Sequence, residues 1–145
     1  MSRRISLYLI DPAEAVIGQA PEPSMSGRIN SIIIRYGDII SREVPAMTEA
    51  EWSFLVDILN GTWLLAEFAT TDPARYLWAE VADADPETAQ KWGIDQRALV
   101  ERLRAMPYSA HCAIAEVVTR FWAAKEQNGS LADQLRAAGA RIRIA

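Results

Sequence analysis

A single amphipathic strand near the start of the chain limits the folds that this sequence can adopt. The segment RRISLYLIDPA, residues 3–13, alternates polar and apolar side chains over its first half. In an extended chain such alternation makes one face apolar and the other polar. The backbone N–H and C=O groups of a strand need partners, yet the residues that follow read as helix. The strand must therefore pair with a distant segment or with a second copy of the chain.

The 145-residue chain has the composition of a globular protein. Half of its residues are apolar and 23% are charged, which suits a chain that buries a core. No apolar run approaches the roughly 20 residues that span a bilayer, and no signal-peptide core opens the sequence. We therefore expect a cytoplasmic protein with no membrane partner.

The charge distribution divides the chain into two parts. Residues 1–44 contain five arginines and five acidic groups, whereas residues 45–145 contain ten basic and fourteen acidic groups. The net charge of −4 argues against indiscriminate binding of nucleic acid, although a local basic surface is still compatible with it. We predict two domains, residues 1–44 and 45–145, in a mainly α-helical protein.

Two helices are predicted after the opening strand. Asp11 is placed to cap a short helix that begins at Pro12, and Gly18 and Pro21 end that helix. Ser26 is the predicted cap of the second helix. Apolar side chains recur in that helix every three or four residues, which predicts a core-facing stripe; they are Ile29, Ile32, Ile33, Tyr36, Ile39 and Ile40.

The region beyond Pro45 is predicted to be an all-helical domain, because capping signals recur along it. The predicted starts are Thr48 with Glu51 as a capping box, Thr62, Asp72 with Pro73, Asp95, Ser109 before the longest helix, and Ser130 before a last short helix that ends near Ala138. All five tryptophans, at positions 52, 63, 78, 92 and 122, lie in this region. We expect them to lie in its core.

The order of strand, short helix and capped helix over residues 3 to about 42 resembles the ribbon-helix-helix family of DNA-binding proteins, of the CopG and Arc type. The resemblance implies two intertwined chains whose opening strands pair as an antiparallel ribbon. Ile5, Leu7 and Leu9 would seal the ribbon onto the helices. A two-stranded ribbon fits the major groove of DNA.

By this resemblance, the outward-facing side chains Arg4, Ser6 and Tyr8 are the expected base contacts. An arginine can make two hydrogen bonds to a guanine, a serine hydroxyl can donate or accept, and a tyrosine adds a hydroxyl and an apolar ring.

The same family holds a DNA phosphate at the start of its second helix. Here that place is occupied by SMSGR, residues 24–28. Ser26, Gly27 and Arg28 are therefore expected to contact a phosphate, because helix N-terminal amides bind anions. Arg3 is a further expected phosphate contact.

A second interpretation of the opening strand rests on the other end of the chain. Residues 140–145, ARIRIA, alternate arginine with isoleucine. Such a segment can pair with the opening strand inside one monomer. In that case Arg4 and Ser6 would only face solvent.

No recognisable catalytic or metal-binding motif is present. His111 is the only histidine and stands next to Cys112, but neighbours on a helix point about 100° apart, so the two cannot act as a nucleophile and its base. Cys112 is expected to be a small buried apolar residue. The acidic segment 80–87 lacks the spacing of a calcium loop and reads as a solvated turn. We expect no enzyme, no cofactor and no metal.

The sequence thus predicts a homodimer that binds double-stranded DNA in a sequence-specific way. A plasmid- or phage-type transcriptional repressor, or a partition or relaxosome accessory protein, would use such a module. The helical domain would bind a protein partner, extend oligomerisation or sense an effector. The alternative is a helical protein–protein interaction module that does not bind nucleic acid.

Overall fold

The computed structural model describes residues 25–60, 73–124 and 128–144. The described part is mainly helical, as predicted, and the predicted opening strand and first helix lie outside it. The elements are α2 (Met25–Glu43), β1 (Ala46–Met47), α3 (Glu49–Ile58), α5 (Pro73–Asp83), α6 (Pro86–Trp92), α7 (Gln96–Ala105), α8 (Tyr108–Ala123), α9 (Leu131–Ala137) and β2 (Arg141–Ile142).

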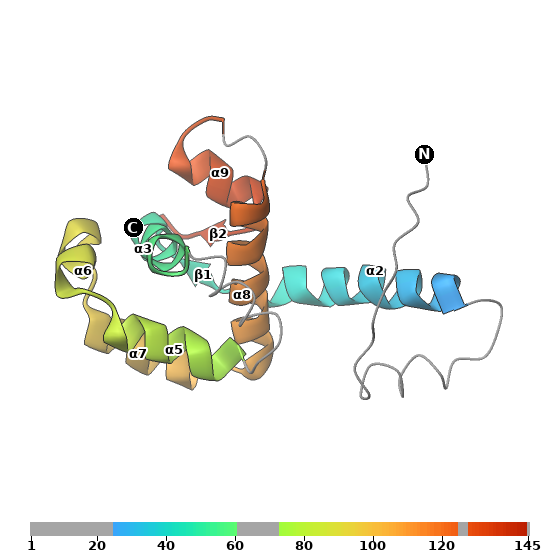
Figure 1. Ribbon diagram of the computed structural model, residues 1–145, viewed down its shortest axis with the longest axis horizontal. Helices are drawn as coiled ribbons and strands as arrows, with labels where there is room; N and C mark the ends of the chain where they lie inside the picture. Colours follow the sequence, from blue (N-terminus) through green and yellow to red (C-terminus); the bar gives the residue numbers. More distant parts are fainter. Residues whose placement is uncertain (1–24, 61–72, 125–127, 145) are drawn as a thin grey trace. The chain divides into compact units, whose positions relative to one another are not determined.

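The chain divides into two units between Ile39 and Ile40, within α2. Ile40 and Val44, at and just beyond the C-terminal end of α2, are buried among the core residues of the C-terminal unit. In that unit α5 packs on α7 and α8, while α3 packs on α6 and α8. Figure 1 shows α5 beside α7 and β1 beside β2.

Local capping signals fix most of the helix starts. The Thr48 hydroxyl accepts from the Glu51 amide at 3.2 Å, and a Glu51 carboxylate oxygen accepts from the Thr48 amide at 2.8 Å. This confirms the predicted capping box. Asp95 and Ser130 also cap their helices as predicted, through side-chain oxygens that accept from Ala98 and Asp133 amides.

The predicted start of α8 and its rank as the longest helix are both wrong. The helix begins at Tyr108 and ends at Ala123, so Ser109 lies inside its first turn and does not cap it. The Ser109 hydroxyl instead donates to the Glu43 carboxylate at 3.0 Å. With 16 residues α8 is shorter than α2, which has 19.

The acidic segment 80–87 contains a helix start that the sequence analysis missed. The Asp85 carboxylate accepts from the Glu87 amide at 3.0 Å, with Pro86 at the first position of α6. Only the residues between α5 and α6 form a turn. Gly93 ends α6 at φ = 66°, a left-handed conformation that glycine adopts without steric cost.

The alternating C-terminal segment does form a strand, and its partner within the described residues is β1. β2 pairs in parallel with β1, with Arg141 opposite Ala46 and Ile142 opposite Met47. The other interpretation, in which residues 140–145 pair with the opening strand, stays a prediction, because the opening strand lies outside the described residues. The C-terminal region is consequently not all-helical, because a small parallel sheet ties its two ends together.

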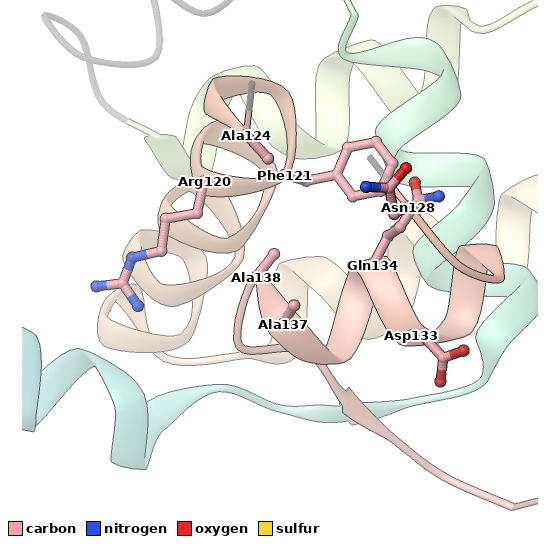
Figure 2. A pocket seen from close by; sticks show the side chains of 8 residues that line it. All are labelled: Arg120, Phe121, Ala124, Asn128, Asp133, Gln134, Ala137 and Ala138. Carbon is pink, nitrogen blue, oxygen red and sulfur yellow. The ribbon is translucent and has the colours of Figure 1, made fainter. Parts of the chain in front are cut away.

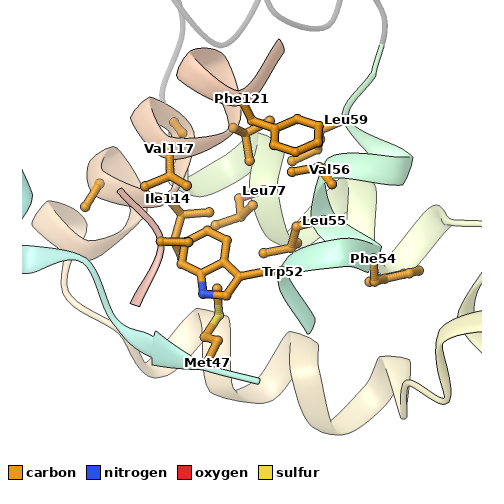
Figure 3. Packing of buried hydrophobic residues seen from close by; sticks show 14 of the residues in the cluster. Met47, Trp52, Phe54, Leu55, Val56, Leu59, Leu77, Ile114, Val117 and Phe121 are labelled. Atoms are coloured by element: carbon orange, nitrogen blue, oxygen red, sulfur yellow. The ribbon is translucent and has the colours of Figure 1, made fainter. Parts of the chain in front are cut away.

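Trp52 lies at the centre of the core (Figure 3). Its side chain is fully buried, and its ring N–H donates to the Arg141 carbonyl at 3.1 Å. Met47, Ile114 and Leu55 are also completely buried in the same cluster. The helix α3 is thus joined to β2 by both apolar contact and a hydrogen bond.

The other tryptophans do not all lie in the core. Trp78 and Trp92 are half-buried, Trp122 is 37% exposed, and Trp63 lies outside the described residues. Trp122 packs edge-on against Phe121, with ring centroids 5.1 Å apart, and its ring N–H donates to the Val56 carbonyl at 3.1 Å. A tryptophan with one polar atom can thus lie at the edge of a core and still be held.

We expect Trp52→Phe to lower the free energy of unfolding by about 2 kcal/mol, because it leaves a void and removes the donor to the Arg141 carbonyl. Trp122→Phe is the matched control, since it removes the same kind of ring N–H from a partly exposed site. Chemical denaturation measures both. Equal losses in the two variants would contradict the central position given to Trp52.

Candidate functional site

Some of the predicted DNA contacts lie within the described residues and others lie outside them. Arg3, Arg4, Ser6 and Tyr8 lie outside the described residues. Ser26, Gly27 and Arg28 all lie in the first turn of α2, which begins at Met25. Ser26 is therefore inside the helix by one residue and is not its cap, contrary to the sequence prediction.

The first turn of α2 has the electrostatics of an anion-binding helix start. The first amides of a helix have no acceptor within the helix, and the aligned peptide dipoles place partial positive charge there. The first turn contains no acidic residue, and Arg42 lies in the last turn. No carboxylate of that turn therefore neutralises the N-terminal end of α2.

The apolar stripe of α2 differs from what the sequence predicts. We call Ile29, Ile32, Ile33, Tyr36, Ile39 and Ile40 the α2 stripe, because at about 100° per residue they fall on one side of the helix. Three of the side chains are about half exposed: Ile33 at 60%, Tyr36 at 47% and Ile39 at 59%. Within the described residues the stripe is therefore not core, except for Ile40 at its C-terminal end.

Ile34 is also exposed, at 65%, but it lies on the opposite side of α2 from the centre of the stripe. Asp38 and Ser41 lie on that side too. A lone apolar side chain among polar neighbours is ordinary, whereas a contiguous apolar stripe on a helix marks an interaction surface. The stripe, and not Ile34, is the feature that calls for a partner.

Glu51 is the most enclosed charged group among the described residues. Besides closing the capping box, its carboxylate accepts hydrogen bonds from both terminal nitrogens of the Arg102 guanidinium. The Glu51 side chain is only 11% exposed, and that of Arg102 is 41% exposed. Burial raises the pKa of Glu51, but the hydrogen bonds from Arg102 and from the Thr48 amide outweigh it and hold the pKa below its ordinary value. The pair ties α3 to α7.

A second polar cluster joins α3 to α6. One Asp57 oxygen accepts from the Lys91 ammonium at 2.9 Å and from the Trp92 ring N–H at 2.8 Å. The Lys91 ammonium also lies 4.7 Å from the centre of the Trp92 ring. The hydrogen bond from Lys91 is the main cause that lowers the pKa of Asp57, and the hydrogen bond from Trp92 is the next. Every group in this cluster has a partner inside the protein, so we assign it to structure.

His111 has the geometry of a structural histidine. Its side chain is buried, and Nε2 donates to the Leu103 carbonyl, which links α8 to α7. Nδ1 is buried without a hydrogen-bond partner. Cys112 is half-buried, which is less than expected, and packs against the edge of the core. The described residues include no group of three or more His, Cys, Asp or Glu side chains that could hold a metal ion.

A cavity of about 160 Å³ lies between α8 and α9 (Figure 2). Phe121 and Ala138 form part of its apolar lining. The charged groups at its rim already have partners, since Arg120 pairs with Glu116 at 3.0 Å and Asp133 pairs with Arg136 at 3.5 Å. The cavity therefore presents little unpaired charge to a ligand.

Sequence reasoning found some of these groups and missed others. The Thr48 and Glu51 pattern identified Glu51 as a capping residue, but nothing local indicated Arg102, which is 51 residues away. The same holds for Asp57, whose partners Lys91 and Trp92 are 34 and 35 residues away. For Asp57, the available signal was an acidic residue within the apolar stretch WSFLVDIL.

Comparison with known proteins gives no relative: neither a protein-family model, nor a curated protein, nor a solved structure matches the chain. In the part of the chain that the structure describes, no helix combines the length and the apolar character needed to cross a membrane.

We expect the ion pair between Glu51 and Arg102 to make the free energy of unfolding fall at acidic pH. The pKa of Glu51 is lower in the folded protein than its ordinary value of 4.5, so its stabilising effect is present at neutral pH and is lost as the pH falls below about 4.5 and through the lowered value. Glu51→Gln keeps an acceptor for the Thr48 amide and loses the charge. We expect its free energy of unfolding at neutral pH to be about 2 kcal/mol lower than that of wild type.

The difference between wild type and Glu51→Gln should shrink as the pH falls below about 4.5 and the Glu51 carboxylate of wild type is protonated. Denaturant titrations at several pH values measure it. Glu101→Gln is the control, because Glu101 pairs with Arg97 on the surface with its side chain 68% exposed, where such pairs contribute little. A difference that stays constant with pH would contradict the assignment to Glu51.

Proposed function

We propose that the protein is a sequence-specific, homodimeric DNA-binding protein, such as a plasmid- or phage-type repressor or a partition or relaxosome accessory protein. The observation that supports this best is the α2 stripe. Its side chains Ile33, Tyr36 and Ile39 are exposed in the single chain, and the residues before the helix are predicted to contain a strand without a neighbour.

A second copy of the chain is the occupant that satisfies both features. A two-fold axis brings the same surface of each chain together, so an apolar stripe meets an apolar stripe without any requirement for a new complementary surface. The same axis brings the two predicted opening strands together as an antiparallel pair, which provides partners for their backbone groups.

The start of α2 supports a contact to phosphate. Ser26, Gly27 and Arg28 lie in its first turn, where no carboxylate opposes an anion. The base contacts Arg4, Ser6 and Tyr8 remain predictions from the alternation of the opening strand. Phosphate contacts would set the register of the protein on DNA, and the ribbon side chains would read the bases.

The alternative, an interaction module without nucleic-acid binding, expects a large apolar patch on the helical unit. In the described part of that unit the exposed large apolar side chains beyond α2 are Tyr108, Trp122 and Ile144. Trp122 is already engaged with Phe121 and the Val56 carbonyl. Most of the described apolar exposure is on α2, which favours the dimer.

The dimer makes a prediction about α2. We expect the double variant Ile33→Glu with Ile39→Glu to be monomeric, because a charge in an apolar interface loses its hydration. Ile34→Glu, with an equally exposed isoleucine replaced on the other side of the helix, should stay dimeric. Sedimentation or light scattering measures the mass. A monomeric wild type, or loss of the dimer in Ile34→Glu alone, would contradict the proposed interface.

DNA readout makes a separate prediction. Wild-type protein should shift fragments from its own upstream region more strongly than shuffled fragments, and binding should weaken with salt. Arg4→Ala with Ser6→Ala should lose this preference by about 1–3 kcal/mol per base contact while the protein remains dimeric. Gel shifts at several salt concentrations measure both. No binding of wild type at low salt would contradict the proposed function.

A further inference from the structure

The arginines of the C-terminal unit fall into two groups. Five basic side chains pair with carboxylates inside the unit: Lys91, Arg97, Arg102, Arg120 and Arg136. Among the arginines of this unit whose side chains the structure describes, four have no carboxylate within 4.0 Å: Arg42, Arg104, Arg141 and Arg143. This is unexpected in a unit, residues 40–145, where acidic residues outnumber basic ones by fifteen to eleven.

Arg104 has a different partner, because its guanidinium lies 4.6 Å from the centre of the Trp78 ring. The other three come from one place in the fold. Arg141 and Arg143 are on or next to β2, and Arg42 is in the last turn of α2, two residues before Val44. We call Arg42, Arg141 and Arg143 the basic face.

The sheet register holds Arg141 and Arg143 on the same side. β2 lies beside β1 (Figure 1), with Arg141 opposite Ala46, and the Arg143 amide donates to the Met47 carbonyl at 2.7 Å. Ile142, between the two arginines, packs against the core. Because side chains alternate along a strand, both arginines face away from the core, with Cα atoms roughly 6.6 Å apart.

The basic face is exposed, and its guanidinium groups form no ion pairs with the described carboxylates. Arg42, Arg141 and Arg143 are all exposed. The Arg141 guanidinium makes one long hydrogen bond, at 3.4 Å, to the Val44 carbonyl. The nearest carboxylate in sequence, that of Glu43, accepts from the Ser109 hydroxyl instead.

Guanidinium groups match phosphate in charge and geometry, which makes a phosphate backbone the fitting partner. Double-stranded DNA, the proposed ligand of the N-terminal module, supplies such a backbone, with about one negative charge per 1.7 Å of helix axis.

We propose that the basic face contacts phosphates of the DNA that the N-terminal module binds. This inference rests on the proposed function and assigns a second, sequence-independent contact to the C-terminal unit. The unit that carries most of the acidic charge then contributes to DNA affinity through one local surface. Base specificity stays with the predicted ribbon.

The salt dependence of binding tests this directly. Each phosphate neutralised contributes about 0.9 to the slope of log affinity against log salt. Arg141→Ala with Arg143→Ala should therefore flatten the slope by up to about 1.8 per chain, or about 3.6 per dimer. The loss of affinity should be similar on the upstream fragment and on a shuffled one, because phosphate contacts carry no sequence information.

The matched control is Arg97→Ala with Arg136→Ala, which removes two exposed arginines that are paired with carboxylates elsewhere on the same unit. It should leave the slope unchanged. Arg141→Lys with Arg143→Lys should keep most of the wild-type slope, because the charge remains. Arg143→Ala alone retains the bond from Arg141 to Val44 and should give about half of the effect, which guards against a folding defect in the double variant.

The outcomes separate the two proposals. If wild type binds and the Arg141 and Arg143 double variant keeps its slope, the basic face is overturned and the DNA-binding function stands. If the control flattens the slope equally, a general charge effect replaces the proposed contact. If wild type does not bind DNA at low salt, both proposals fall. A flatter slope limited to the basic-face variants, with the upstream preference retained, supports the inference.

Discussion

The burial of Trp52 is the interaction on which the C-terminal unit depends. Its indole ring fills the centre of the core, and its one polar atom donates to the Arg141 carbonyl 89 residues later. A fully buried ring N–H without an acceptor would cost about as much as a lost hydrogen bond. The strand β2 must therefore lie where it does, and β1 follows because it pairs with β2.

The adjacent residue, Glu51, extends the same constraint to α7. Its backbone belongs to the first turn of α3, and its carboxylate both caps that turn and receives Arg102. Two neighbouring residues thus determine where α3 starts, which face of it is buried and which helix packs beside it. Ile40 and Val44 then pack into this core, so the C-terminal end of α2 is held while the middle of its stripe is exposed.

The sequence predicted what is encoded within a few residues and failed where partners are distant. Capping by Thr48, Asp95 and Ser130 depends on amides three positions away, so it can be read from the chain. Alternation in residues 140–145 left a strand open as one interpretation, and part of that segment does form β2. Alternation contains no information about which segment lies alongside, so the pairing of β2 with β1 was missed. The α2 stripe was predicted from its period, but a period cannot say whether the covering surface belongs to the same chain.

The energetics of the α2 stripe connect it to the predicted opening strand. Fully burying an isoleucine or a similar side chain contributes about 1.5–3 kcal/mol. The three exposed stripe residues are already about half buried, so each has roughly 1 kcal/mol left to gain, and two chains together about 6 kcal/mol. Association costs an estimated 4–15 kcal/mol in lost freedom of motion. The stripe alone is therefore too small to hold a tight dimer.

A dimer formed through α2 requires a further shared surface. The sequence offers one in an antiparallel ribbon of two opening strands, with Ile5, Leu7 and Leu9 turned inward. The strand and the stripe therefore depend on the same dimer. The strand needs a partner for its backbone groups, and the stripe needs a larger buried surface than it provides by itself.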